Sequence, residues 1–181
     1  MERCRIVFSG SGGQGVITAS IILAEAAVLH ENMTAVQSQF YGPEARGGAT
    51  RSDVIISYAQ INYPKVIQPN VLICLTQQAY NKFYPIIRPG GLLITDSRFV
   101  EIQKKVDARH KELPMYRMVM DNIGKPIVFN ICMLGAVIVL ADLVKPESIM
   151  KVLETRIPSN FLEINSSALD LGIKLAEEYK S

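Results

Sequence analysis

The sequence contains only three cysteines and two histidines, and it has no tryptophan. Cys4, Cys74 and Cys132 are far apart, and each falls within a segment that we predict to be a buried strand or helix. Such a distribution is typical of free thiols in a reducing compartment, and it argues against disulfides, a zinc ribbon and a local iron–sulfur motif. His30 and His110 lack neighbours at metal-ligand spacing, so we expect both on the surface and no metal on this chain.

The sequence has a small net charge and no long run of apolar residues. The chain has 19 basic and 17 acidic residues, a formal net charge of +2, and no long run of like charges. We therefore expect neither a nucleic-acid partner nor an anionic membrane partner. The first residues lack the apolar core of a signal peptide, and the longest apolar run, residues 131–141, is too short to cross a bilayer. These features predict a soluble, cytoplasmic protein.

Length, composition and patterning predict one α/β domain over residues 1–181. With 181 residues, 49% of them hydrophobic, the chain can bury a core of ordinary size. Strands are expected at residues 4–8, 34–39, 53–58, 71–76, 92–95 and 116–120, and helices at 16–29, 77–87, 130–143, 147–156 and 166–179, with Asn165 or Ser166 as the last N-cap. The order predicts a three-layer αβα fold with a mostly parallel sheet and a helical C-terminal third. The basic segment 101–112 is expected to be a solvated helix-and-loop surface.

Residues 9–15, with the sequence SGSGGQG, form the glycine-rich connection between the first strand and the first helix. A strand that feeds through such a turn into a helix leaves amide N–H groups free to hold an anion. The alternative is a tight turn whose glycines only permit positive φ and close packing. We predict binding by Gly12, Gly13, Gln14 and Gly15.

The spacing of Gly10, Gly12 and Gly15 also satisfies the dinucleotide pattern G-x-G-x-x-G. A dinucleotide site needs an acidic residue at the end of the second strand, where this chain has Gln37, Ser38 and Gln39. A nicotinamide cofactor is therefore disfavoured. A P-loop is excluded because no Lys-Ser or Lys-Thr pair follows the last glycine.

A second loop, residues 40–52 with the sequence FYGPEARGGATRS, is rich in glycine, proline and charge. The loop has two positive charges, Arg46 and Arg51, and only one negative charge, Glu44. Loops that leave the carboxyl ends of strands one and two can meet at one edge of a sheet. We predict that Arg46 and Arg51 face the glycine amides across one anion, although an Arg46–Glu44 pair that only shapes the loop stays open.

Together the two motifs resemble one family. SGSGGQG followed by QSQFYGPEARGGATRSDVIIS is similar to the gamma subunit of the 2-oxoacid:ferredoxin oxidoreductases, and the form YGPEARGG is most similar to the 2-oxoglutarate branch. The resemblance covers the chain from residue 3 to about residue 179. It implies a subunit that closes an active site shared with alpha and beta subunits, and possibly with a ferredoxin-like delta subunit.

The resemblance implies that the whole complex oxidatively decarboxylates a 2-oxoacid and makes an acyl-CoA. It also implies thiamine diphosphate, magnesium and iron–sulfur clusters in the complex, coenzyme A as a substrate and ferredoxin as the electron acceptor. The sequence has no clustered cysteines and no GDG-type thiamine motif, so we expect no cofactor on this chain itself. Two alternatives stay open, a free-standing oxidoreductase that uses NAD or a flavin and a purely structural assembly subunit.

We expect the purified chain to be catalytically inactive without partners. It carries no nucleophile–base pair and no cofactor motif beyond the glycine turn, so we predict no catalytic residue. A 2-oxoacid decarboxylation assay on the isolated chain tests this. Turnover by the chain alone, free of partner subunits, would contradict the prediction.

Overall fold

The structure is a computed structural model that describes residues 3–40, 48–103 and 107–180. The strands are β1 (Arg3–Gly10), β2 (Thr34–Phe40), β3 (Thr50–Ser57), β4 (Val71–Cys74), β5 (Gly91–Asp96) and β6 (Ala108–Leu113). The α-helices are α1 (Val16–His30), α2 (Gln77–Phe83), α3 (Met115–Asn122), α4 (Phe129–Ala141), α5 (Pro146–Arg156) and α6 (Ser159–Glu178). Two short 3-10 helices, η1 (Tyr84–Ile86) and η2 (Pro126–Val128), follow α2 and precede α4.

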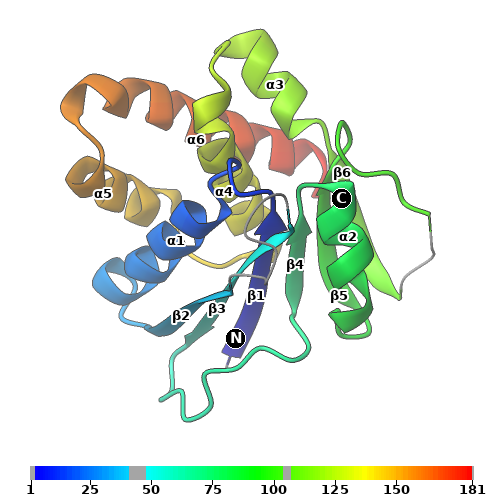
Figure 1. Ribbon diagram of the computed structural model, residues 1–181. Coiled ribbons are helices and arrows are strands. Elements are labelled where there is room, and N and C mark those ends of the chain that lie inside the picture. The colour runs from blue at the N-terminus through cyan, green and yellow to red at the C-terminus, as the bar shows by residue number, and fades with distance from the viewer. Residues whose placement is uncertain (1–2, 41–47, 104–106, 181) are drawn as a thin grey trace.

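The six strands form one mixed sheet in the order β2-β3-β1-β4-β5-β6 (Figure 1). Strands β1, β4, β5 and β6 pair in parallel. Strand β3 lies between β1 and β2 and runs antiparallel to both. The predicted αβα class is confirmed, and β3 makes the sheet mixed rather than all-parallel.

Helices cover both faces of the sheet (Figure 1). In β1, the side chains of Ile6 and Phe8 join the cluster packed against α1, α4, α5 and α6, while Val7 joins the cluster packed against α2. Both clusters are almost fully buried. The apolar run in β1 follows from this burial on both sides.

Helix α4 is a core helix. Nine of its thirteen residues are buried, and its apolar surface is covered within this chain, chiefly by the sheet and α6. The two helices approach closely at Gly135 and Gly172, where an added Cβ atom would overlap the carbonyl oxygens of Leu169 and Cys132 respectively. An absent side chain at these two positions therefore permits the packing.

Two expected elements are wrong. Residues 116–120 belong to helix α3, in which Met115 and Val119 are buried four positions apart on one helical stripe. The sixth strand is β6, within the segment that we expected to be a helix-and-loop surface. It is an edge strand with mostly exposed, charged residues, and such residues protect an edge from pairing with other chains. Its sequence therefore lacks the apolar alternation that marks a strand.

The last helix begins earlier than expected. Helix α6 starts at Ser159, immediately after Pro158, so Asn165 lies inside it and Ser166 does not cap it. The Nδ2 atom of Asn165 instead donates a hydrogen bond to the carbonyl of Phe161 at 2.8 Å. Pro158 thus ends α5 and also provides the N-cap position of α6.

The scarce residue types lie where the sequence predicted. Cys4, Cys74 and Cys132 are free and buried, and burial raises the pKa of each thiol to about 12. His30 and His110 are exposed. Among the described helices, none is long and apolar enough to span a membrane.

We expect Gly172→Ala to lower the free energy of unfolding by about 2–4 kcal/mol, because the new methyl group would force α4 and α6 apart. Urea denaturation followed by circular dichroism measures the change. Gly13→Ala is the matched control, because a Cβ atom there would meet nothing within 4 Å. Equal stabilities for the two variants would contradict the close packing.

Candidate functional site

The glycine turn and the ends of the second loop lie at one edge of the sheet. Gly10, at the end of β1, pairs with Thr50 at the start of β3. Phe40, at the end of β2, pairs with Arg51. The described residues on both sides of the second loop are therefore beside the glycine turn. The described ends of the two connections lie at the same edge of the sheet, while residues 41–47 of the second loop lie outside the described residues, so contact between the two connections stays a prediction.

Two glycines of the turn have clear steric roles. Gly15 is the N-cap of α1 with φ 68°, and an added Cβ atom would lie 2.7 Å from Nδ2 of Asn130 in α4. A Cβ atom at Gly10 would meet the side-chain oxygen of Gln14. At Gly13, by contrast, an added Cβ would meet no atom within 4 Å, and φ is not positive. Gly13 is therefore free of steric demands from the fold.

Gln14 faces back into the protein. Its Oε1 atom accepts a hydrogen bond from the amide of Ser11 at 2.8 Å, and its Nε2 atom donates to the carbonyl of Leu75 at 3.0 Å. Its own amide donates to the carbonyl of Ser11 at 3.2 Å. Gln14 thus ties the turn to the end of β4, and its backbone amide and one of its two side-chain N–H groups are bonded within the protein.

A groove of about 460 Å³ opens at the N-terminal end of α1. Gly13, Gln14 and Gly15 form part of its wall. The other walls come from α1, η2, the start of α4 and the α5–α6 junction, and they include Thr18, Ile22, Lys125, Pro126, Ile127, Val128, Asn130, Ile131, Arg156, Ile157, Phe161, Ile164 and Asn165. The groove is therefore mostly apolar, with polar groups contributed by the turn and by several of the surrounding elements.

The positive charge of the groove comes from two sources. The N-terminal end of α1 carries the equivalent of about half a positive charge. Lys125 adds a full charge and forms no ion pair with any described residue. Arg156 is paired with Glu25, and this hydrogen bond lowers the pKa of Glu25. Such a groove suits an elongated ligand with an apolar part and an anionic group.

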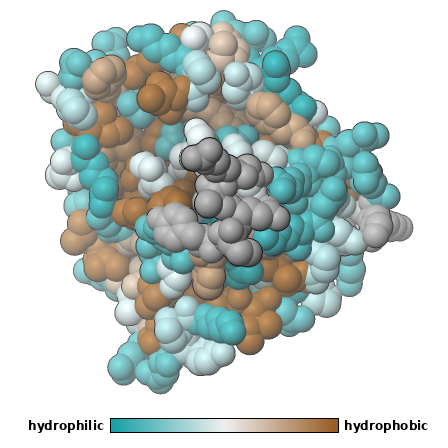
Figure 2. All heavy atoms as spheres, viewed as in Figure 1, coloured by the Kyte–Doolittle hydropathy of each residue, from teal (hydrophilic) through white to brown (hydrophobic). Residues whose placement is uncertain are grey.

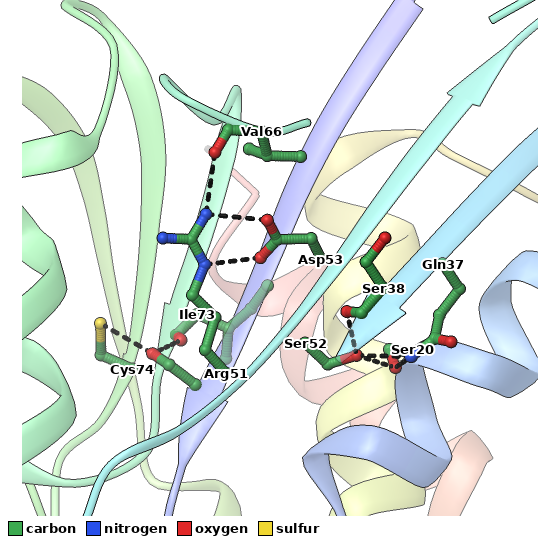
Figure 3. A network of polar contacts seen from close by, with 10 residues as sticks. Ser20, Gln37, Ser38, Arg51, Ser52, Asp53, Val66, Ile73 and Cys74 are labelled. Atoms are coloured by element: carbon green, nitrogen blue, oxygen red, sulfur yellow. Dashed lines mark hydrogen bonds and ion pairs between the residues drawn. The ribbon is translucent and has the colours of Figure 1, made fainter. Parts of the chain in front are cut away.

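Arg51 is placed differently from our expectation. It lies within β3 rather than in the loop, and its Nε and Nη2 atoms donate to the carboxylate of Asp53 at 2.6 and 2.8 Å. Nη2 also donates to the carbonyl of Val66 at 2.9 Å (Figure 3). The guanidinium lies over the ring of Phe83. Burial raises the pKa of Asp53, while Arg51 opposes this rise.

Asp53 is a carboxylate partner of Arg51 that lies outside the loop segment 40–52. It follows Arg51 by two residues on the same face of β3, where strand alternation puts the two side chains together. The described structure brings Arg51 to Asp53 and shows no contact between Arg51 and the glycine amides. Its part in ligand binding stays a prediction. Arg46 and Glu44 lie outside the described residues.

A buried hydroxyl network holds α1 against the sheet on the opposite side of β3 from Arg51 (Figure 3). The hydroxyls of Ser20 and Ser52 are 2.6 Å apart, and Gln37 in β2 donates to Ser52 at 2.8 Å. Ser52 also donates to the carbonyl of Ser38 at 3.4 Å. The network joins α1, β2 and β3, and so fixes the helix whose first turn lines the groove.

Asp96, at the carboxyl end of β5, is fully buried. Its two carboxylate oxygens accept hydrogen bonds from the amides of Arg98 at 2.9 Å and Tyr116 at 2.7 Å. Burial raises the pKa of Asp96, and the two amides oppose this rise. The carboxylate thus connects the end of β5 to the first turn of α3.

The structure assigns the predicted binding residues to different roles. Gly13, Gln14 and Gly15 line the groove, whereas Gly12 lies beside Thr50 and does not. Two polar groove residues, Lys125 and Asn130, were missed by the sequence reasoning. They come from more than 100 residues later in the chain, and no local pattern connects them with the turn.

Comparisons with known proteins give one consistent result. A family model described as pyruvate ferredoxin/flavodoxin oxidoreductase matches residues 5–175. The 2-oxoglutarate synthase subunit KorC of Methanocaldococcus jannaschii is 44% identical, over 97% of this chain and 95% of that protein. The pyruvate synthase subunit PorC of Methanothermobacter thermautotrophicus is 26% identical, over 97% of both chains. The keto/oxoacid ferredoxin oxidoreductase gamma subunit of Geobacter sulfurreducens, a crystal structure, has a TM-score of 0.91 and 37% identity over 100% of both chains.

Asp96 gives a pH prediction for this edge of the sheet. Because its pKa is higher in the folded state, its contribution to stability is largest below its ordinary pKa and is lost as the pH rises through the raised folded value. The Asp96→Asn variant has no carboxyl group to titrate at this position. The hydrogen bonds that it loses change its free energy of unfolding by an amount that does not vary with pH. Urea unfolding from pH 3 to 7 should show wild type losing stability relative to the variant as the pH rises. A constant difference, or one of opposite sign, would contradict the assignment.

Proposed function

Because the chain belongs to the pyruvate ferredoxin/flavodoxin oxidoreductase family, we propose that it is the gamma subunit of a multi-subunit 2-oxoglutarate:ferredoxin oxidoreductase. The observation that carries this proposal is the match to a gamma subunit along the full length of both chains. The substrate rests on the higher identity to a 2-oxoglutarate synthase subunit, 44%, than to a pyruvate synthase subunit, 26%. The complex would decarboxylate 2-oxoglutarate oxidatively, form an acyl-CoA and pass electrons to ferredoxin.

The cofactors of such a complex would be held by the partner alpha and beta subunits, and possibly by a ferredoxin-like delta subunit. All three thiols of this chain are buried, with pKa values of about 12, so they are poor ligands for an iron–sulfur cluster. Among the described residues, no group of three or more His, Cys, Asp or Glu side chains could hold a metal ion. Thiamine diphosphate, magnesium and the clusters would therefore be bound elsewhere in the complex.

The groove beside the glycine turn is the best place on this chain for a ligand of the complex. Its donors, the amides of Gly13 and Gly15, the Lys125 ammonium and the Asn130 amide, fit a phosphate, and its apolar wall fits an uncharged chain. Coenzyme A has both parts. We assign to this groove a phosphate of coenzyme A or of thiamine diphosphate whose remainder is held by a partner subunit. A role for Arg46, which lies outside the described residues, stays a prediction.

The rim of the groove fits a partner that closes it. Ile127 is 83% exposed and Phe161 is 50% exposed, and both line the groove. Figure 2 shows hydrophobic atoms among hydrophilic ones over the upper part of this face, where α3 and α6 lie in Figure 1. Exposed apolar side chains around a cavity are typical of a surface that another protein covers. The gamma subunit would thus complete the shared active site rather than form one alone.

Neither of the two alternatives, a free-standing oxidoreductase that uses NAD or a flavin and a purely structural assembly subunit, is supported. In a dinucleotide-binding fold the strands next to the glycine turn are parallel, but here the antiparallel strand β3 separates β1 from β2. The full-length family match also assigns the chain to an enzyme complex rather than to a free-standing dehydrogenase. A purely structural role would leave the groove without a ligand, and the next experiment distinguishes this case.

We expect Gly13→Val to raise the apparent KM for coenzyme A in the assembled complex by about tenfold or more. The added side chain would occupy the groove without straining the turn, since a Cβ atom at Gly13 meets nothing within 4 Å. The loss of one or two charge-assisted hydrogen bonds, worth about 1.5–3 kcal/mol each, accounts for this magnitude. Steady-state kinetics with varied coenzyme A and varied 2-oxoglutarate measures the effect.

Ser11→Val is the matched control, because Ser11 is exposed in the same turn and does not line the groove. It should leave both Michaelis constants unchanged. Kinetics of Gly13→Val equal to those of the control would reject the ligand site. Loss of subunit assembly in Gly13→Val, with no change in KM for the fraction that assembles, would favour the structural role.

A further inference from the structure

A second groove lies at the opposite edge of the sheet, where β1, β4 and β5 begin. It has a volume of about 620 Å³ and is lined by Arg5, Tyr63, Lys65, Ile67, Gln68, Arg88 and Pro89. Three of these seven residues are cationic and none is acidic. No part of this groove belongs to the glycine-turn site.

The positive charge of this groove is not neutralised by ion pairs within the described part of the chain. Among the described residues, Arg5, Lys65 and Arg88 take part in no ion pair. A fourth cation, Arg3, lies two residues before Arg5 on the same face of β1, and its Nη2 atom donates to the carbonyl of Gln60 at 3.2 Å. Asp142 lines an adjoining cavity together with Arg88, and neither Asp142 nor Asp107, whose carbonyl accepts from the amide of Gly90, lines this groove. The groove therefore has an excess of positive charge.

Hydrogen bonds brace the backbone at two of these cations, Arg5 and Arg88. The amide of Arg5 donates to Oδ1 of Asn70 at 3.0 Å, and the amide of Asn70 donates to the carbonyl of Arg5 at 2.7 Å. The amide of Arg88 donates to the carbonyl of Pro69 at 3.2 Å. These bonds connect β1, the chain before β4 and the turn before β5. The backbone at Arg5 and Arg88 is thus fixed beside the groove, so binding there does not have to order it.

Apolar side chains lie among the charges. Tyr63 is 57% exposed and Ile67 is 60% exposed, on either side of Lys65 in the chain. An inorganic anion makes no use of such side chains, whereas a polypeptide buries them while its carboxylates meet the cations. Exposed aromatic and aliphatic side chains between basic residues thus favour a protein ligand over a small one.

We propose that the groove formed by Arg5, Tyr63, Lys65, Ile67 and Arg88 docks a carboxylate-rich segment of another subunit of the same complex. This proposal rests on the proposed function, which places the redox groups on partner subunits. An electron acceptor such as ferredoxin would dock near those redox groups, which lie on the partner subunits and not on this chain. The acidic segment that fills this groove therefore belongs to a subunit of the complex and not to the electron acceptor. The glycine-turn edge and this edge are then two separate contacts of the chain within one assembly.

Zero-length carbodiimide cross-linking of the assembled complex tests the contact directly, because it joins an amine to a carboxylate only when the two touch. Peptide mass spectrometry should find Lys65 joined to an Asp or Glu of another polypeptide. Lys65→Arg should remove this cross-link while the complex stays assembled. Cross-links from Lys65 only within its own chain, or none, would overturn the proposal.

Charge reversal supplies the energetic test. Lys65→Glu/Arg88→Glu should weaken binding to the purified partner subunits by about tenfold or more at low ionic strength, with a smaller effect as salt is added. Lys151→Glu/Lys174→Glu, at two exposed positions of α5 and α6, has the same charge change and is the matched control. Circular dichroism confirms that each variant is folded. Equal weakening in both pairs would show a general effect of net charge and would reject the groove.

Two competitors separate the other possible occupants. If inorganic phosphate at millimolar concentration abolishes the Lys65 cross-link, the groove is a small-anion site and the proposal is wrong. If a single-stranded oligonucleotide binds wild type and not the Lys65→Glu/Arg88→Glu variant, a nucleic acid is the ligand and the proposal is again wrong. A complex that decarboxylates 2-oxoglutarate but shows neither the cross-link nor the salt-dependent loss would reject the docking groove and leave the proposed function intact.

Discussion

Close approach at three glycines, to the Asn130 side chain at Gly15 and to backbone atoms at Gly135 and Gly172, determines how the helical layer is built. Gly15 permits the N-terminal end of α1 to lie against Asn130 of α4, and Gly135 and Gly172 permit α4 to lie against α6. Without these contacts α4 could not fill the space between the sheet and α6. Because α4 begins at the groove, the same packing that closes the core also places Asn130 beside the glycine turn. The site and the core therefore depend on one set of contacts.

Buried polar groups are bonded internally, and this limits what they can offer a ligand. Asp53 holds Arg51, and backbone amides hold Asp96. Leaving any of these partners unpaired would cost more than the interaction itself contributes. The ammonium of Lys125, the side-chain amide of Asn130, the amides of Gly13 and Gly15 and the end of α1 are thus among the described groups near the groove that can still respond to an anion.

The sequence predicted most of the helices and strands correctly. In these elements the spacing of the apolar residues and the glycine or proline residues at the ends indicate the same structure. It failed where these signals are weak, in the charged edge strand β6 and in α3, whose short apolar pattern resembles a strand. The antiparallel direction of β3 follows from the length of the connection before it. Only nine residues separate Phe40 from Thr50, too few for the crossover that a parallel pair requires. Lys125 and Asn130 could not be predicted, because only the tertiary fold brings them to the turn.

The reversed direction of β3 explains the placement of both grooves. Since β3 returns antiparallel from the end of β2, it begins beside Gly10 at the carboxyl edge, so the two family motifs meet without a crossover helix. For the same reason β3 ends at the amino edge, and the chain must pass along that edge before it enters β4. This passage carries Tyr63, Lys65 and Ile67 to Arg5. One antiparallel strand thus places the groove proposed for a ligand at the carboxyl edge of the sheet and the groove proposed for a partner subunit at the amino edge.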